Sequence, residues 1–418
     1  KPDATKEINR MIEAEAIKLY DAARNLDSKE RENIGKWVSR SEQAATIRNT
    51  EWIAQSQIPF ADDGTSWDKN TMLLGCSNGI IDLFSGQMRE GISTDRITMT
   101  TSVAYDPNAL CPLWEKFIDD IFLPLSDKEA VIHWVQKALG YALTGSTKEQ
   151  VIFVGHGAGA NGKGVLMTTL VNLLGDYGQT APSATFKKSK YQSQSNDLAR
   201  MQHKRFVAAS ETSDDAQFDE ERLKALSGGD KIAARFLFQE HTEFYPELKL
   251  WLFLNHKPLV SDDSFGFWRR IRLVPFLRTF NGKDRDPDLG EKLQQELPGI
   301  LNWLIKGCLL WQEEGLADVP ESITNATDEY QRESDWFSDF LHTCCDTGEY
   351  NSCSARELFD TYCSWASSEG IATKDTLTAT AFGRKVAEKF KKERTNRGNV
   401  YSKLSVKENV IREKLGNY

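Results

Sequence analysis

The sequence of 418 residues lacks any hydrophobic run long enough to cross a bilayer. Its longest apolar stretches, such as residues 250–254, have the length of buried strands. No signal-like segment opens the chain, and neither an internal repeat nor a low-complexity tract occurs in it. These absences exclude a membrane-spanning protein and a solenoid, and they predict a soluble intracellular protein without a membrane partner.

Cysteine is scarce, and its spacing fits no usual metal site. The seven cysteines contain no C-x2-C pair, and their number is odd. This pattern predicts reduced thiols rather than disulfides. Cys344, Cys345, Cys353 and His342 lie close together in the sequence. Adjacent cysteines with a single histidine are not a usual zinc pattern, so thiols are favoured over zinc.

An excess of positive charge is also lacking, except at the end of the chain. The net charge is −9, which argues against a protein coated in nucleic acid. Residues 384–418 nevertheless carry eleven Lys and Arg against four Glu. This asymmetry predicts a local electrostatic site, with a solubilising charged tail as the alternative.

A glycine-rich segment in the middle of the chain lies between a predicted buried strand at 151–154 and an apolar helix. It has the pattern G-x-x-x-x-G-K, in which backbone N–H groups and the lysine bind phosphate. Gly164 stands where a Ser or Thr would hold Mg²⁺. The predicted phosphate-binding residues are Gly157, Ala158, Gly159, Ala160, Asn161, Gly162, Lys163, Gly164 and Val165.

Two polar residues follow predicted buried strands further along the chain. Glu211 follows the strand 206–210, and Asn255 follows the strand 248–254. In a nucleotide hydrolase, a carboxylate at this position lies beside Mg²⁺ and the attacking water. An amide there could orient the water or contact the γ-phosphate. The plainer interpretations are an ordinary strand end for Glu211 and a turn cap for Asn255.

Two arginines, Arg269 and Arg270, come just before an apolar strand at 271–276. A guanidinium group suits phosphate oxygens, and an arginine from a neighbouring subunit can stabilise transition-state charge. A surface salt bridge is the alternative for either arginine. A hairpin is predicted around 239–242, and it carries Lys231, Arg235, Phe236 and Phe238.

The remaining patterns describe the ends of the chain. Helices are expected at 6–23, from an N-cap at Ser28 to 37, and at 47–53, followed by a β-meander with strands at 72–74, 79–84 and 97–103. Further helices are expected at 113–122, 128–143, 286–314 and 320–342. A helix at 354–368, a basic helix at 377–390 and a strand at 399–406 form a winged-helix-like pattern.

In their order and spacing, these motifs resemble the superfamily 3 helicases, and more closely the phage, plasmid and poxvirus primase-helicase family. Glu211 comes 48 residues after Lys163, Asn255 follows after 44 more, and Arg270 after a further 15. Segments 77–87 and 105–114 look like the N-terminal domain of that family, and 226–235 looks like its B-prime segment. The chain looks like the C-terminal helicase part of a phage primase-polymerase.

The resemblance implies an α/β fold, with an AAA+-like P-loop ATPase core, an N-terminal α+β domain and a C-terminal winged-helix domain. The expected boundaries are 1–112, 113–148 (a helical connector), 149–282 (the ATPase core), 283–343 (a helical segment) and 344–418. It also implies an ATP-driven DNA helicase of phage or plasmid replication, in the host cytoplasm if the protein comes from a phage. A homo-hexameric ring would bind ATP between its subunits.

The resemblance also implies roles for individual residues. Lys163 would bind phosphate, Glu211 would serve Mg²⁺ and water activation, Asn255 would be the sensor, and Arg270 or Arg269 would act on the neighbouring subunit. Mg²⁺ would be held by phosphate oxygens, waters and Glu211, with Thr168 or Thr169 as a further ligand.

Single-stranded and forked DNA are the implied partners. Lys231 and Arg235 would touch the DNA backbone, Phe238 or His241 would stack on bases, and Arg384 and Lys385 would bind DNA from the basic tail. The chain shows no set of acidic primase ligands and begins with Lys1, so a fused or associated primase or polymerase domain is expected elsewhere.

Two other classes of protein stay open. A P-loop phosphotransferase acting on a small molecule would use the same loop, but it would need neither the hairpin nor the basic tail. A DNA-binding protein with a degenerate nucleotide site is favoured by Gly164. Stimulation of nucleotide hydrolysis by single-stranded DNA separates these classes from a helicase.

Overall fold

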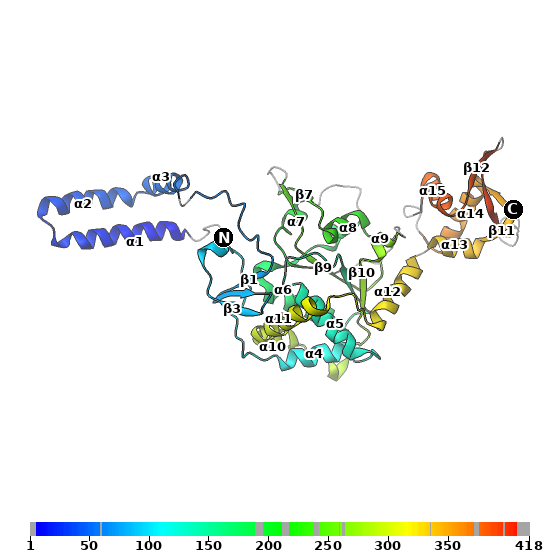
Figure 1. The fold of residues 1–418 in the computed structure, drawn as a ribbon, viewed down its shortest axis with the longest axis horizontal. Helices are drawn as coiled ribbons and strands as arrows, with labels where there is room; N and C mark the ends of the chain where they lie inside the picture. The colour runs from blue at the N-terminus through cyan, green and yellow to red at the C-terminus, as the bar shows by residue number, and fades with distance from the viewer. Residues whose placement is uncertain are drawn as a thin grey trace. The chain divides into compact units, whose positions relative to one another are not determined.

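The computed structural model describes residues 6–58, 61–188, 195–210, 217–236, 242–258, 260, 264–334, 336–371, 376–395 and 398–407. The chain divides into two compact units. The first comprises Lys1–Pro258 with Arg269–Ala326, and the second comprises Leu259–Trp268 with Thr327–Tyr418 (Figure 1). The finer domain boundaries expected from the sequence stay a prediction. Within the described ranges, no helix has the length and apolar character needed to cross a membrane.

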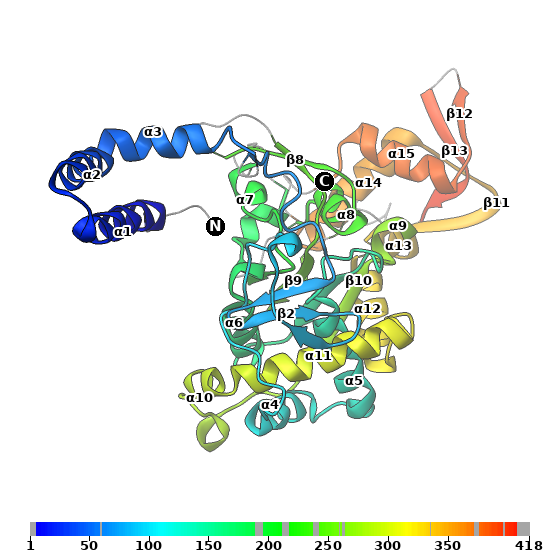
Figure 2. The same ribbon diagram turned by 60° about the vertical axis from the view of Figure 1, so that its left-hand side comes forward.

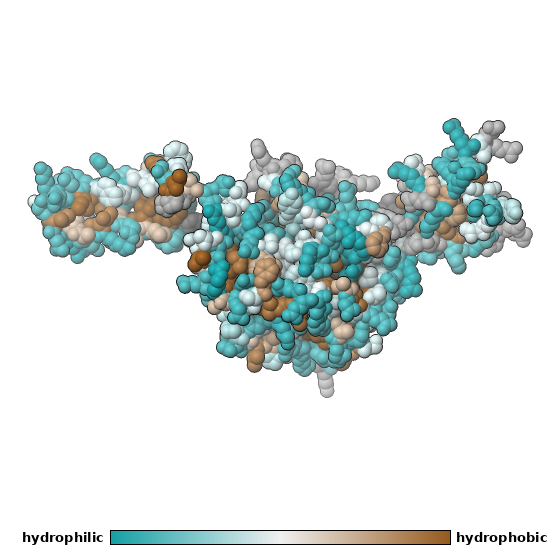
Figure 3. Space-filling model, in the orientation of Figure 1, coloured by the Kyte–Doolittle hydropathy of each residue, from teal (hydrophilic) through white to brown (hydrophobic). Residues whose placement is uncertain are grey.

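The first helices of the chain confirm the periodicity of the sequence. They are α1 (Glu7–Ala22), α2 (Ser28–Ser41) and α3 (Ala44–Ala54). The N-cap of α2 is Asp27 rather than Ser28, because the Asp27 carboxylate accepts hydrogen bonds from the backbone N–H groups of Lys29 and Glu30. Several large apolar side chains of this segment are exposed, among them Met11, Trp37 and Trp52. Figure 3 shows brown, hydrophobic surface over these helices.

A small antiparallel sheet follows, with strands β1 (Leu73–Cys76), β2 (Gly79–Asp82) and β3 (Gln87–Arg89). The strand expected at 97–103 does not form, and the polar β3 takes the third place instead. Residues 97–103 make isolated bonds to different neighbours: the Thr101 N–H donates to Gly75, and the Ser102 N–H donates to Leu173. Because its hydrogen bonds go to two different elements, this segment does not form the regular hydrogen-bond ladder of a β-strand.

A central sheet of five parallel strands confirms the expected α/β class. The strand order is β10-β4-β9-β6-β5, and all four pairings are parallel. The strands are β4 (Ile152–His156), β5 (Gly178–Thr180), β6 (Phe206–Ser210), β9 (Lys249–Leu254) and β10 (Ile271–Pro275). Phe153 and Trp251 stack at 4.4 Å between ring centroids on neighbouring strands. The short, polar β5 had no signal in the sequence.

Helices surround this sheet, and α4, α5 and α11 gather on the same side of it in both ribbon views (Figures 1 and 2). Besides α1 to α3, the first unit contains the helices α4 (Pro112–Phe122), α5 (Lys128–Tyr141), α6 (Lys163–Leu174), α7 (Ser195–Ala199), α8 (Glu220–Gly228), α10 (Leu289–Gln295) and α11 (Leu297–Glu314). Short 3-10 helices are η1 (Ala23–Asn25), η2 (Ser93–Asp95), η3 (Gly175–Tyr177), η4 (Ser183–Phe186) and η5 (Gly282–Asp284). A two-stranded hairpin joins β7 (Ile232–Ala234) and β8 (Thr242–Phe244).

The second unit has its own aromatic core. Its elements are α9 (Phe265–Trp268), α13 (Trp336–Cys344), β11 (Cys345–Ser354), α14 (Ala355–Ser368), α15 (Ala379–Lys389), β12 (Lys392–Thr395) and β13 (Gly398–Val406). The unit boundary falls within α12 (Glu321–Ser334). The sheet has the antiparallel order β11-β13-β12, and Tyr362 stacks on Phe382 at 4.7 Å. Cys344, Cys345 and Cys353 are buried in this core.

Candidate functional site

The glycine-rich loop lies at one edge of the central sheet, between β4 and α6. The strands are parallel, so their carboxyl ends meet at this edge. His156 of β4 pairs with Leu254 of β9, and Phe253 pairs with Ser210 at the end of β6. Ligands of open α/β sheets bind outside the carboxyl ends of the strands. The fold therefore brings the loop, the end of β6 and the end of β9 to one place.

Two glycines of the loop could not carry a side chain. A Cβ at Gly157 would lie 2.2 Å from the Phe276 carbonyl oxygen. Gly162 has a φ of +87°, and a Cβ there would lie 2.7 Å from Ile121. The backbone of the loop is thus pressed between α4 and the segment that follows β10, and it leads directly into the N-terminus of α6. Backbone N–H groups at such a helix start favour anions.

Lys163 is buried beneath this loop, with 6% of its surface exposed. Its ammonium group donates to the Gly157 carbonyl at 2.6 Å and to the Asn161 side-chain oxygen at 3.1 Å. The Asn161 amide nitrogen in turn donates to the Phe276 carbonyl at 3.2 Å. Burial lowers the pKa of Lys163 to about 8. The lysine is held by neutral acceptors, which an anionic oxygen could replace.

A cavity of about 860 Å³ opens beside the loop. Gly159 to Val165 line it, together with Ser210 and Asn255 from the ends of β6 and β9. Its size is that of a small-molecule or cofactor site. The structure brings Lys163 and Asn255 to one cavity, while Glu211 lies outside the described residues, one position beyond Ser210. On α6, Thr168 is exposed and Thr169 is buried.

The arginine pair lies at the opposite edge of the sheet. Arg269 and Arg270 precede β10, and the Arg270 carbonyl accepts a bond from the N–H of Ile152 at the start of β4. Arg269 donates to the Gln150 side chain at 2.6 Å. The two strands run parallel for five residues, so about 15 Å of sheet separates this edge from the loop. The pair and Lys163 are not brought together within one chain.

The antiparallel pairing of β7 with β8 confirms the expected hairpin, while residues 239–241 of its predicted turn lie outside the described residues. Lys231 donates to Glu243 at 3.3 Å and lies 5.6 Å from the Tyr245 ring centroid. Arg235 is exposed. The expected tip residues Phe238 and His241 lie outside the described residues.

In the second unit, the basic helix expected from the sequence is α15. Arg384 is exposed, whereas Lys385 is half-buried with its ammonium group 5.7 Å from the Phe337 ring centroid. Lys389 lies over the same ring at 5.3 Å. All of β12, which begins at Lys392, is exposed. Basic side chains of α15 therefore both cover the core and reach solvent.

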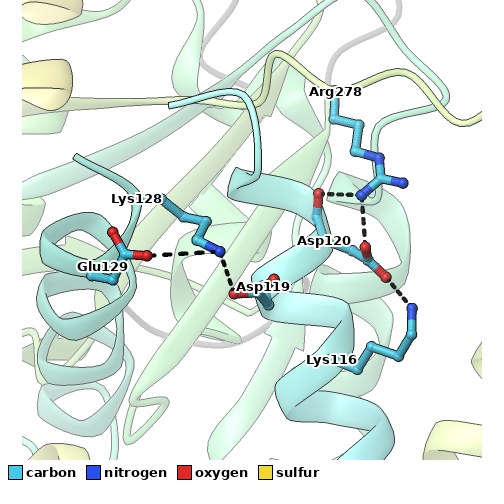
Figure 4. A network of polar contacts seen from close by, with 6 residues as sticks. All are labelled: Lys116, Asp119, Asp120, Lys128, Glu129 and Arg278. Atoms are coloured by element: carbon cyan, nitrogen blue, oxygen red, sulfur yellow. Dashed lines mark hydrogen bonds and ion pairs between the residues drawn. The ribbon is translucent and has the colours of Figure 1, made fainter. Parts of the chain in front are cut away.

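Sequence patterns did not predict one wall of the cavity, which α4 and the segment after β10 form. Leu113, Lys116, Phe117 and Asp120 of α4 line it, as do Phe280 and residues 284–287 and 289. Asp120 binds Lys116 on the same helix and Arg278 from the segment after β10 (Figure 4). The i, i+3, i+4, i+7 spacing on α4 is a signal of one helix face. The 158 residues between Asp120 and Arg278 hide the contact from the sequence.

A parallel α/β sheet whose interior strand leads into a G-x4-G-K loop beside a cavity defines a P-loop-like core. Three family models match successive parts of the chain. One described as "D5 N terminal like" matches residues 1–123, a family of unknown function matches 155–270, and one described as "Poxvirus D5 protein-like" matches 332–416.

Several known proteins are similar in sequence or structure to parts of this chain. "Putative helicase L207/L206" of Acanthamoeba polyphaga mimivirus is 30% identical over 66% of this chain and 30% of its own length. "Putative primase C962R" of African swine fever virus is 22% identical over 49% of this chain and 22% of its own. The apo structure of the NrS-1 C-terminal region is 13% identical, with a TM-score of 0.41 over 68% of this chain and 63% of that chain.

Together, the two D5-like models and the viral relatives support a viral primase-helicase family for this chain. It spans about a third or less of the length of the curated relatives it matches.

Proposed function

We propose that this chain is the ATP-driven helicase part of a viral replication protein, and that it acts as a ring on single-stranded DNA. The observation that carries the proposal is the common cavity of Lys163, Ser210 and Asn255 at the carboxyl edge of the sheet. These groups surround a space in which a triphosphate would meet a buried cation, a helix N-terminus and a polar strand end.

The hydrolysis step uses groups that the chain itself supplies. Lys163 would exchange the Gly157 carbonyl for phosphate oxygens, and Asn255 would orient the attacking water. Glu211, phosphate oxygens and waters would hold Mg²⁺, because Gly164 offers no side-chain oxygen. Bound there, Mg²⁺ would neutralise charge that develops on the phosphates. Burial of the lysine makes its electrostatic contribution larger than it would be in water.

The arginine pair supports an oligomer. Arg269 and Arg270 lie on the sheet edge opposite the loop, so they would complete the site of a neighbouring subunit rather than their own. In such a homo-oligomer, which family resemblance suggests is a hexamer, each cavity would be finished by the next chain. Arg270 would then stabilise transition-state charge in trans.

Two basic surfaces support DNA as the partner. The hairpin after Asp230 presents Lys231 and Arg235, and α15 with β12 presents Arg384 and further lysines. The arrangement of α14, α15 and the β12–β13 hairpin supports a winged-helix domain, in which α15 would contact the DNA backbone. A primase or polymerase domain would be fused to or associated with the chain.

A second function is favoured by one observation, the glycine at position 164. A DNA-binding protein with a degenerate nucleotide site would bind ATP and DNA without turnover. The deciding experiment measures phosphate release by the full chain with Mg²⁺ and ATP, with and without single-stranded DNA. We expect hydrolysis that DNA stimulates. Binding without hydrolysis would favour the degenerate site, and hydrolysis indifferent to DNA would favour a phosphotransferase.

A further inference from the structure

The cavity beside the loop has a wall that the phosphate chemistry does not use. Leu113, Lys116, Phe117 and Asp120 present one face of α4 to it. Phe280 and Leu289 line it from the segment beyond β10. This wall combines apolar and aromatic surface with the carboxylate of Asp120, and Asp284 and Asp286 add further carboxylates to the lining of the cavity. Pockets that bind small molecules orient them through a few such polar groups in apolar surroundings.

Asp120 is held rigidly in this wall (Figure 4). One carboxylate oxygen accepts a hydrogen bond from Lys116 Nζ at 2.6 Å, and the other accepts one from Arg278 Nη1 at 2.6 Å. The same Arg278 nitrogen donates to the Asp120 carbonyl at 3.1 Å. Partial burial acts to raise the pKa of Asp120, but the bonds from Lys116 and Arg278 outweigh it and lower that pKa. The group is therefore an anion at neutral pH.

The carboxylate is also tied to the loop. The Phe280 N–H donates to the Ala160 carbonyl at 2.7 Å, and the Arg278 guanidinium lies 4.8 Å from the Phe280 ring centroid. Arg278 then binds Asp120. This continuous chain of contacts sets the distance between the loop and the carboxylate, so a ligand whose phosphates occupy the loop would meet Asp120 at a defined position.

We propose that Asp120 reads the base of the bound nucleotide by accepting a hydrogen bond from its exocyclic amino group. This inference rests on the proposed function. An ionised carboxylate only accepts hydrogen bonds, so it favours a base with an amine at that position and disfavours one with a hydrogen or a carbonyl. The apolar surface of Phe117, Phe280 and Leu289 suits the base better than the sugar. The substrates would be nucleotides with amino-bearing bases.

The test compares ADP with purine riboside 5′-diphosphate, which lacks only the exocyclic amine. Diphosphates avoid turnover, so equilibrium binding to the full chain can be followed by calorimetry. We expect ADP to bind about 10-fold or more tightly than the analogue, the effect of one hydrogen bond to a charged group. In Asp120→Ala the preference should fall to about twofold or less. Asp120→Asn, which keeps the shape and one acceptor oxygen, should retain an intermediate preference.

Asp119 provides a matched control, because it is adjacent on α4 but binds Lys128 at 2.7 Å instead of facing the cavity network (Figure 4). Asp119→Ala should keep the wild-type preference. Equal weakening of both ligands in Asp120→Ala would show a structural role and overturn the inference. So would a wild-type protein that binds both ligands equally.

A third ligand, 2′-deoxy-ADP, separates base from ribose. If the mutation instead abolishes discrimination between ADP and 2′-deoxy-ADP, Asp120 reads the sugar and the inference is overturned. Failure of the wild-type chain to bind any diphosphate would overturn the proposed function itself. Binding without base discrimination would overturn only the role of Asp120.

Discussion

The two edges of the central sheet hold their cations differently. At the carboxyl edge, Lys163 is bound by one carbonyl and one amide oxygen and lines a cavity. At the opposite edge, Lys249 is enclosed, 1% exposed, and its ammonium donates to the carbonyls of Thr144, Ser146 and Glu247. Arg205, 3% exposed, donates to the Leu143 carbonyl nearby.

The comparison of these residues shows which buried basic side chain could bind a ligand. Thr144 and Leu143 follow the end of α5, where the helix dipole favours positive charge. Lys249 and Arg205 therefore fasten α5 to the starts of β9 and β6, and neither side chain lines the loop cavity. Lys163 has a cavity beside it and partners that a phosphate can replace. Burial alone would not have separated these residues.

The largest expected effect concerns the arginine edge. In a homogeneous assembly, Arg270→Ala should lower ATP hydrolysis about 1,000-fold, because a trans arginine contributes at least that much to phosphoryl transfer. Mixing Arg270→Ala with Glu211→Gln subunits should restore part of the activity. At a mixed interface, the intact Glu211 of one chain meets the intact Arg270 of the other. Phosphate release measured across mixing ratios checks this, and no recovery at any ratio would contradict a role in trans.

A matched pair of substitutions tests the two lysines directly. Lys163→Met should lower hydrolysis about 100- to 1,000-fold, the loss of one preorganised charged donor. Its thermal stability should be unchanged or slightly higher. Lys249→Met should instead destabilise the fold by about 3 kcal/mol, because it leaves several buried carbonyls without a donor. Denaturant unfolding and turnover per folded molecule distinguish the two, and the comparison fails if both variants lose mainly stability.

The amino-acid sequence predicts the strands and the phosphate-binding loop at the carboxyl edge of the sheet. It does not predict the buried lysine at the opposite edge. The strands β4, β6, β9 and β10 are apolar runs, and the loop between β4 and α6 has a distinctive motif. Lys249, however, sits at the start of one of those runs, and nothing in the sequence marks it as buried. Two of its three partners, Thr144 and Ser146, lie 105 and 103 residues away in the chain.

The errors have the same origin. Residues 97–103 alternate like a strand but divide their hydrogen bonds between β1 and the end of α6. The polar strands β3 and β5 form because a neighbouring strand offers a free edge, which local pattern does not encode. The pairing of Asp120 with Arg278 likewise depends on how α4 packs beside the segment after β10.

The third prediction is the pH dependence of nucleotide binding. Burial lowers the pKa of Lys163 to about 8, below its unfolded value of 10.5. The charged form that attracts phosphate therefore predominates below about pH 8 and is lost as pH rises. ADP affinity should fall by up to about 10-fold per pH unit above that value. Lys163→Arg stays charged throughout, so its affinity should be flat from pH 7.5 to 9.5. A parallel fall in both proteins would place the titration elsewhere.

The folding equilibrium should show the opposite sign over the same range. Between about pH 8 and 10.5 the unfolded chain binds more protons at this lysine than the folded chain does. The contribution of Lys163 to stability therefore rises with pH in that window. Stability and ligand affinity should diverge as pH increases, which separates loss of the charge from loss of the fold.

The smallest expected effect concerns Gly164. A Cβ there would meet nothing within 4 Å, its φ is not in the left-handed region, and the residue lies in the first turn of α6 facing the cavity. Gly164→Ser should therefore fit without strain. It should stabilise the helix by about 0.5 kcal/mol through lower backbone entropy in the unfolded chain.

Gly164→Ser should also supply the hydroxyl that P-loop proteins place on Mg²⁺, so the Mg²⁺ concentration needed for half-maximal hydrolysis should fall about threefold. Gly164→Ala, which gives the same helix without the oxygen, is the matched control. If both variants shift the Mg²⁺ dependence equally, the metal does not approach this position. If neither variant hydrolyses ATP, the result favours a DNA-binding protein with a degenerate nucleotide site.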